Sequence, residues 1–265
     1  MSQPFVRTEA RGPVALITVD RPDRSNALSS PVIAGLGDAL DGARYDPAIR
    51  SIVLTGAGSV FCSGMDLQEA VQTLASGAPE AEHAAVATAQ ALADLFVQIH
   101  DCPKPVIAAV NGDALAGGAG LAMACDLVVA ADSARIGYPE VKRGLVAAIV
   151  MHDLTRLLGD RRARQLLLTG DPIAASDAER WGLVNRVVPA AECLEAAMAL
   201  GRSLLESGPI ALEATKKQLD EVTRRPRDLR GSAAVSAAIR VSDEASEGMA
   251  SFLEKRRPRW ASHPG

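Results

Sequence analysis

The hydrophobic positions of the chain fall into short apolar runs separated by polar and glycine-containing segments. Residues 14–19 alternate loosely and are rich in β-branched side chains, a pattern that predicts a strand. Apolar runs at 52–55, 105–110 and 127–130 predict further strands, and the first two end at glycine-containing turns. The first half of the chain is therefore expected to build a sheet.

Longer stretches between these runs have the signature of helices. Ser30-Pro31 places an N-cap residue before a proline at the first helical position, which predicts a helix through Ala43. The alanine-rich stretch 82–100 predicts a long helix that ends before a proline, and residues 117–123 predict a short one. Strands and helices in repeated order favour an α/β fold with helices packed against sheets.

Strand patterns almost vanish after residue 149. The spacing of Ser176 and Glu179 predicts a helix that opens with a capping box. Gly208-Pro209 separates two more helices, and residues 243–255 predict a last one.

This change of pattern divides the chain into an α/β core over residues 1–200 and a C-terminal helical region over residues 201–265. With 265 residues, 48% of them hydrophobic, the chain can bury a sizeable core. The helical region packs either on its own core or on a neighbouring chain, and the sequence leaves both arrangements open.

Composition and charge exclude several classes of protein. A net charge of −4 argues against nucleic acid or an anionic membrane as the main partner. The first residues are polar, and no apolar run is long enough to cross a bilayer, so we expect a cytoplasmic protein. The cysteines form no CxxC pair and no zinc-ligand spacing with histidine, so we expect reduced thiols and no metal. They are Cys62, Cys102, Cys125 and Cys193.

Three glycine-containing loops follow strands of the predicted core, at residues 61–66, 111–120 and 136–140. Glycines after a strand let the backbone come close to a ligand. If Gly117 opens a helix, the positive end of the helix dipole adds to its N–H groups, as needed to hold a developing oxyanion. Each loop alone is more often an ordinary tight turn, and a glutamate such as Glu140 is more often a solvated charge at a helix start.

The motifs of these loops resemble one known family when they are taken together. They read K-P-V-I-A-A-V-N-G at 104–112, A-G-G-x-x-L-A-M-A-C-D at 116–126 and A-x-I-G-Y-P-E-V-K-x-G-L at 134–145. Further motifs are R-P-x-x-x-N-A-L at 21–28, W-G-L-V-N at 181–185 and F-L-E-K-R-R-P-R at 252–259. In this order, from about residue 12 to residue 260, they are similar to motifs of the enoyl-CoA hydratase/isomerase family, the crotonase superfamily.

The resemblance implies a crotonase-like spiral of ββα units with a C-terminal helical region that helps to build homotrimers, often paired into hexamers. It implies an acyl-CoA or enoyl-CoA thioester as the substrate, with coenzyme A as part of that substrate and no permanently bound cofactor. The partners expected are therefore the thioester and further copies of the chain.

The resemblance also assigns roles to residues. The backbone N–H groups of Met65 and Gly117 would hold the thioester oxygen, and Glu140 would be the acid/base. Donors on that oxygen favour the enolate form, so a proton at Cα becomes removable and Cβ of an enoyl group becomes electrophilic. A carboxylate near Cα can then move protons.

The family binds the adenine end of CoA near the segment that corresponds to residues 24–27 and around Asp66-Leu67. Arg24 would meet a phosphate there as a cation. The expected contacts to the CoA ester are Arg24, Ala27, Met65, Asp66, Leu67 and Gly117.

One candidate catalytic position, Gly120, departs from the best-known hydratases of the family, which have a glutamate there and a second one in the P-E loop. Three functions stay open. Hydration of an enoyl-CoA is favoured because Tyr138-Pro-Glu-Val-Lys resembles the hydratase branch. Isomerisation of the double bond needs only Glu140. The third function is that of a CoA-ester-binding homologue with little turnover, because half of the acid/base pair is gone.

Four other side chains are candidates to replace the missing glutamate. Histidine is a common general base, but we expect His152 on a helix after the Glu140 loop and without a catalytic role. The others are Asp113, Tyr138 and Asp153.

Overall fold

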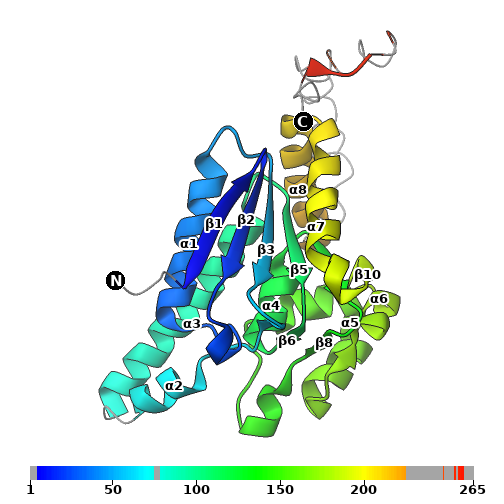
Figure 1. Ribbon diagram of the computed structural model, residues 1–265. Helices are drawn as coiled ribbons and strands as arrows, with labels where there is room; N and C mark the ends of the chain where they lie inside the picture. Colours follow the sequence, from blue (N-terminus) through cyan, green and yellow to red (C-terminus); the bar gives the residue numbers. More distant parts are fainter. Residues whose placement is uncertain (1–4, 75–77, 225–246, 248–253, 255, 260–265) are drawn as a thin grey trace.

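The computed structural model describes residues 5–74, 78–224, 247, 254 and 256–259, and two β-sheets surrounded by helices make up most of this part (Figure 1). The larger sheet has the strand order β1-β2-β3-β5-β7-β10, in which β1 is antiparallel to β2 and the other neighbours are parallel. Its strands are β1 (Val6–Arg11), β2 (Val14–Val19), β3 (Ser51–Gly56), β5 (Val106–Val110), β7 (Leu127–Ala131) and β10 (Arg186–Val188).

The smaller sheet has the order β4-β6-β8-β9. Its first three strands are parallel, and β9 runs antiparallel to β8. The strands are β4 (Val60–Cys62), β6 (Asp113–Leu115), β8 (Arg135–Gly137) and β9 (Ile173–Ala174).

Helices follow and cover these strands (Figure 1). The α-helices are α1 (Ser30–Tyr45), α2 (Leu67–Leu74), α3 (Ala78–His100), α4 (Gly117–Ala124), α5 (Met151–Thr169), α6 (Ala175–Trp181), α7 (Cys193–Ser203) and α8 (Pro209–Arg224). Short 3₁₀ helices are η1 (Pro22–Arg24), η2 (Pro139–Arg143), η3 (Ala190–Glu192) and η4 (Leu204–Glu206).

One unit repeats along the chain: a strand of the larger sheet, a strand of the smaller sheet, and then a helix. β3 and β4 are followed by α2 and α3, β5 and β6 by α4, and β7 and β8 by η2 and α5. The turns between paired strands pack closely, since a Cβ on Gly112 would lie 1.9 Å from the Ser59 carbonyl oxygen. Asn111 joins the same two turns, because its side chain donates to the Gly58 carbonyl at 2.9 Å. This succession is the ββα spiral that the resemblance implies.

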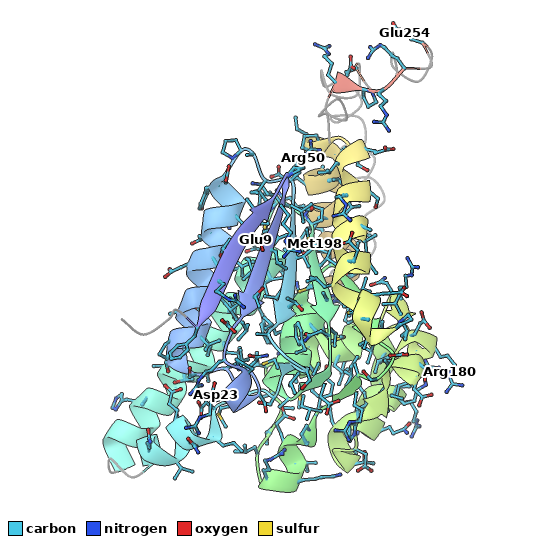
Figure 2. All side chains as sticks on the ribbon, in the orientation of Figure 1. Glu9, Asp23, Arg50, Arg180, Met198 and Glu254 are labelled. Carbon is cyan, nitrogen blue, oxygen red and sulfur yellow. The ribbon has the colours of Figure 1, made fainter. Side chains whose placement is uncertain are left out.

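The core lies between the larger sheet and the helices packed on it. α7 contacts β3, β5 and β7, and its Met198 is fully buried beside the sheet (Figure 2). Gly201 lets the helix come close, and the Ser51 hydroxyl donates to the Gly201 carbonyl at 3.1 Å. The four cysteines, all among the described residues, are buried and unpaired.

The structure confirms most of the elements predicted from the hydrophobic pattern, including the strand at 14–19 and the helix after Gly208-Pro209. The prediction of a capping box is wrong, because α6 begins at Ala175 and Ser176 lies inside the helix. Glu179 instead accepts the Val187 N–H at 2.9 Å.

The C-terminal part of the chain differs from its sequence pattern in a second way. Two strands, β9 and β10, follow residue 149, although strand patterns almost vanish there. The helix predicted over 243–255 lies almost wholly outside the described residues, and the division at residue 200 stays a prediction. Of the helices described, none is both long and apolar enough to cross a membrane.

Candidate active site

The three glycine-containing loops follow three neighbouring parallel strands of the smaller sheet. β4 pairs with β6 through Cys62 and Ala114, and β6 pairs with β8 through Leu115 and Gly137. Met65, Gly117 and Glu140 come two or three residues after these strands end. Because parallel strands end at the same edge of a sheet, the fold brings these residues to one edge, the usual place for a ligand in an α/β protein.

The N–H of Met65 points away from its neighbouring strand segment. Leu28 uses both of its backbone groups on the residues that flank Met65: its N–H donates to the Gly64 carbonyl at 2.8 Å, and its carbonyl accepts the Asp66 N–H at 3.3 Å. Successive groups of an extended chain point to opposite sides. The Met65 N–H is therefore directed to the side opposite Leu28.

Gly117 is the first residue of α4. An N–H in the first turn of a helix has no acceptor within that helix and lies at the positive end of its dipole. The preceding residue, Ala116, has a left-handed φ of 53°, and its N–H donates to the Gly137 carbonyl at 2.8 Å. This hydrogen bond ties the start of α4 to the strand that leads to Glu140.

The Met65 and Gly117 loops are in direct contact through Gly64. A Cβ on Gly64 would lie 2.7 Å from the Ala116 Cβ and 3.1 Å from the Gly117 nitrogen. Gly64 also has a φ of 89°, which other residues rarely adopt. Glycine at this position therefore allows two backbone donors to approach one another.

Glu140 lies in η2, directly after Pro139, and is half-buried. Burial raises the pKa of its carboxyl group, and its own backbone N–H and the charge of Arg143 offset part of that increase. Its Oε2 atom is enclosed and has no hydrogen-bond partner within the described part of the chain. A carboxyl group with a raised pKa is a stronger base when ionised and a ready acid when protonated.

Gly120 faces a filled space. A Cβ there would lie 2.3 Å from Val150 Cγ1 and 3.0 Å from two ring carbons of Phe96. Val150 and Phe96 are both buried, each with 4% of its surface exposed. Apolar side chains therefore occupy the direction in which a side chain at position 120 would point.

The turn over residues 21–28, for which the sequence predicted only CoA contacts, is buried from Asn26 to Leu28 and holds neighbouring loops in place. Asn26 is fully buried with a left-handed φ of 54°. Its side chain accepts the Arg21 N–H at 2.9 Å and donates to the carbonyls of Ala57 and Val60 at 2.9 and 2.7 Å. The position of asparagine in the R-P-x-x-x-N-A-L motif is the sequence signal for this turn.

Asp66 is held by the protein itself. Arg21 donates to Asp66 Oδ2 at 2.6 Å, and the other oxygen accepts the N–H groups of Gln68 and Glu69 at the start of α2. Burial alone would raise the pKa of Asp66, but these hydrogen bonds outweigh it and lower the pKa. The carboxylate of Asp66 thus orders the Met65 loop, and any CoA contact would come from its backbone.

The other residues expected to contact CoA lie around this loop. Ala27 is buried, whereas Arg24 and Leu67 are exposed to a little under half of their surface. The Arg24 guanidinium donates to the side chain of Gln68. Figure 2 labels Asp23, the residue before Arg24, in the part of the molecule where α2 lies.

Two of the four side chains considered as replacements for the missing glutamate are engaged in hydrogen bonds with other side chains. Asp113 accepts from Arg135, and Asp153 accepts from His100 Nε2 at 3.0 Å. His152 is exposed on α5, as expected from the sequence. Tyr138 is fully buried.

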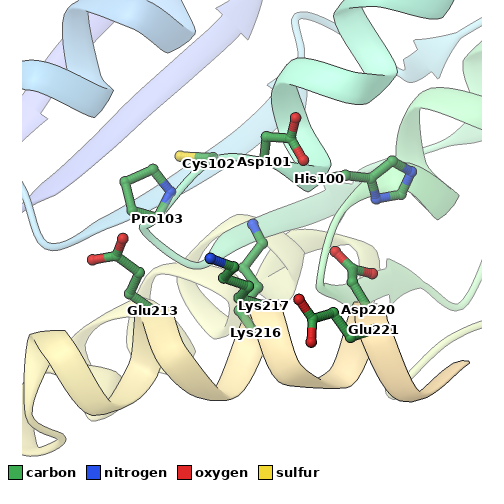
Figure 3. Close-up of a pocket in the computed structure, with 9 residues that line it drawn as sticks. All are labelled: His100, Asp101, Cys102, Pro103, Glu213, Lys216, Lys217, Asp220 and Glu221. Atoms are coloured by element: carbon green, nitrogen blue, oxygen red, sulfur yellow. The ribbon is translucent and has the colours of Figure 1, made fainter. Parts of the chain in front are cut away.

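A pocket between the end of α3 and α8 lies apart from these loops (Figure 3). Lys216 reaches across it to the carbonyls of Ile99 and Lys104 and to Asp126. Met65, Gly117 and Glu140 do not line this pocket, so it is separate from the candidate active site.

The chain is similar to known proteins over nearly its whole length. A model of the enoyl-CoA hydratase/isomerase family matches residues 9–263. A putative enoyl-CoA hydratase from Thermus thermophilus is 41% identical over 252 residues, which cover 94% of this chain and 98% of the relative. A carnitinyl-CoA dehydratase from Salmonella arizonae is 38% identical, and the match covers 97% of this chain and 98% of the relative.

Solved structures share the fold over nearly the whole chain. A putative enoyl-CoA hydratase/isomerase (crotonase) from Legionella pneumophila is 33% identical, with a TM-score of 0.89, and the match covers 98% of this chain and 100% of that one. This similarity confirms the crotonase-like fold expected from the motifs.

Proposed function

The chain belongs to the enoyl-CoA hydratase/isomerase family, and from this membership we propose that it is an enoyl-CoA hydratase, a lyase that adds water across the 2,3-double bond of an enoyl-CoA thioester. The convergence of Met65, Gly117 and Glu140 at one edge of the smaller sheet supports this proposal most directly. It supplies two backbone donors and one carboxyl group with a raised pKa.

In the proposed reaction the N–H groups of Met65 and Gly117 bind the thioester oxygen and stabilise the negative charge that develops on it. Glu140 takes a proton from water as the water oxygen bonds to Cβ, and the double-bond electrons move to the thioester oxygen as an enolate. Glu140 then returns the proton to Cα, which regenerates the carboxylate and gives the 3-hydroxyacyl thioester. Gly120 has no side chain to transfer a proton, and its role in this reaction is to leave room for neighbouring side chains.

The CoA part of the substrate is proposed to bind along the turn 24–27 and the start of α2. Arg24 is exposed there and would meet a phosphate as a cation in addition to its contacts with Gln68 and Asp23. Ala27, Met65, Asp66 and Leu67 would contribute mainly backbone and apolar contacts.

Isomerisation is the second candidate function. Position 120 is a glycine, and Val150 and Phe96 fill the space beside it, so Glu140 is the carboxylate proposed for the site. An isomerase needs only one carboxylate to carry a proton from Cα to Cγ. The similarity to a carnitinyl-CoA dehydratase favours hydration, because dehydration is the reverse of that reaction.

An assay with crotonyl-CoA and a 3-enoyl-CoA in parallel tests the proposal. A hydratase converts crotonyl-CoA to the 3-hydroxyacyl thioester and incorporates one solvent deuterium at Cα in D₂O. Conversion of the 3-enoyl-CoA to the 2-enoyl-CoA without hydration would favour the isomerase. Binding of both esters without turnover would identify a CoA-ester-binding homologue.

Gly120→Glu alone is expected to lower hydration of crotonyl-CoA, because its Cβ would meet Val150 Cγ1 at 2.3 Å. Overpacking of this kind costs about 1–3 kcal/mol. Gly120→Glu combined with Val150→Ala removes the obstructing methyl groups. It should raise the ratio of hydration to isomerisation, since two nearby carboxyl groups keep one as an acid and one as a base.

Val150→Ala alone is the control, and hydration and isomerisation are measured in each preparation together with the thermal midpoint. A Gly120→Glu variant as stable as the parent would mean that the site accommodates a side chain at position 120.

We also propose a homotrimer or hexamer, as the family resemblance implies. Light scattering at micromolar concentrations should give three or six times the mass of the chain, 27.6 kDa. A monomer throughout that range would contradict this proposal.

A further inference from the structure

Tyr138 buries a hydroxyl group beside the proposed acid/base. Its side chain is fully buried, and its Oη has no hydrogen-bond partner among the described residues. Leaving a buried polar group unpaired is costly, whereas phenylalanine has the same shape without the hydroxyl group. A tyrosine buried in this position therefore indicates that its hydroxyl group forms a hydrogen bond with a nearby group.

Glu140, two residues further along, presents the complementary group. In the described part of the chain, the buried side-chain oxygens and nitrogens without a partner are Ser29 Oγ, Tyr138 Oη and Glu140 Oε2. Two of these three thus belong to one short segment at the candidate active site. A phenol can donate a hydrogen bond and an ionised carboxylate can only accept one.

The charges around Tyr138 leave Glu140 as the available acceptor. Burial, followed by the negative charges of Glu140 and Asp153, raises the pKa of Tyr138. Asp153, on α5, already accepts from His100 Nε2 at 3.0 Å and is 3.4 Å from Arg156. Glu140 Oε2 has no such partner within the described residues.

The two side chains also differ in how firmly they are held. Tyr138 directly follows β8, whose Gly137 pairs with Leu115 and accepts the Ala116 N–H. Glu140 lies in η2, whose residues are half-buried or exposed, and the chain after it stays exposed as far as Val146. The hydroxyl group of Tyr138 thus lies in the enclosed part of this segment, two residues before a carboxylate in a more exposed turn.

We propose that Tyr138 is a positioning residue: its hydroxyl group donates a hydrogen bond to Glu140 Oε2 and so fixes the carboxylate with Oε1 toward the substrate. A rotation of the Glu140 side chain forms this bond. Oε1 is then the oxygen that exchanges the proton. This inference rests on the proposed function of Glu140 as the acid/base.

Tyr138→Phe tests the hydrogen bond in the full chain. Loss of a hydrogen bond to the charged carboxylate should lower kcat by about 10- to 100-fold and leave KM little changed. Loss of a donor to the ionised carboxylate raises the pKa of Glu140, so the acidic limb of the pH profile should move to higher pH. Removal of an unpaired hydroxyl group would instead leave kcat and the pH profile unchanged, and that result overturns the inference.

Fluorotyrosine provides a second test that does not depend on the folding of Tyr138→Phe. Tyr45 and Tyr138 are the two tyrosines of the chain, and Tyr45 is 73% exposed on α1. Tyr45→Phe protein grown with 3-fluorotyrosine therefore carries one label, at Tyr138. The unlabelled Tyr45→Phe protein is the control and is expected to keep the activity of the parent. The more acidic fluorophenol is a stronger donor, so the acidic limb should move to lower pH.

The fluorine resonance of the same protein should titrate with Glu140 and lose that titration in Glu140→Gln. A resonance that does not change with pH in either background overturns the inference. If the unlabelled protein turns over no enoyl-CoA ester, the proposed function fails, while this titration still decides whether the hydrogen bond exists. If it hydrates crotonyl-CoA and Tyr138→Phe matches it in every respect, the function stands and the inference fails.

Discussion

Glu140→Gln should lower turnover of an enoyl-CoA by about 10²–10⁴-fold, because the amide keeps the size of the side chain and cannot exchange the proton. Binding of a saturated acyl-CoA should change little, since the N–H groups of Met65 and Gly117 are unaffected. Stopped assays give the rate and calorimetry gives the affinity. Glu192→Gln, at an exposed position of η3, is the matched control.

The activity and the stability of the parent and of Glu140→Gln should depend on pH in different ways. Glu140 acts as a base in its ionised form, and burial raises its pKa, so activity of the parent should fall as the pH drops through that raised value. A group whose pKa is raised in the folded state contributes stability at low pH and loses that contribution as the pH rises through the folded pKa.

Glu140→Gln should therefore gain thermal stability relative to the parent as the pH rises from about 4 to 8. A variant that keeps near-normal turnover would assign the proton transfer to another group. A variant that loses acyl-CoA binding as well would mean that Glu140 has a structural role.

The longer elements could be predicted from the sequence because their signals are local. Ser30-Pro31 correctly indicates the start of helix α1, although the N-cap is Ser29 and Ser30 already lies inside the helix. An apolar run that stops at a turn indicates β5. The short strands of the smaller sheet were not predicted. β6 and β8 have three residues each and are defined by pairing between distant segments, as when Leu115 pairs with Gly137.

The motifs located the loops of the candidate site but not what surrounds them. From family spacing alone, Gly120 looks like an empty place for a carboxylate, yet Val150, thirty residues later, fills it. Arg21 and Asp66 are 45 residues apart, and no periodicity links them. Side-chain contacts of this kind depend on the assembled fold, which is why the sequence could not predict them.

Gly64→Ala is expected to lower kcat by about 10²–10³-fold, the usual cost of losing one donor to an oxyanion. The new Cβ would lie 2.7 Å from the Ala116 Cβ and 2.9 Å from the Leu115 carbonyl oxygen. The Met65 and Gly117 loops must separate to make room, and their N–H groups can then no longer bind the same oxygen. The infrared stretching frequency of a bound thioester carbonyl should shift toward its value in water, because the carbonyl is less polarised.

The control for Gly64→Ala must have the same backbone strain without the close contact. Gly182 has a φ of 86°, close to the 89° of Gly64, and a Cβ there would meet no atom within 4 Å. Both substitutions should cost about 1–2 kcal/mol of stability for placing a side chain in the left-handed region. Gly182→Ala should keep the kcat and carbonyl frequency of the parent. If Gly64→Ala behaves in the same way, the contact between the two loops does not hold the thioester oxygen, and the two donors would have to be sought elsewhere at this edge of the sheet.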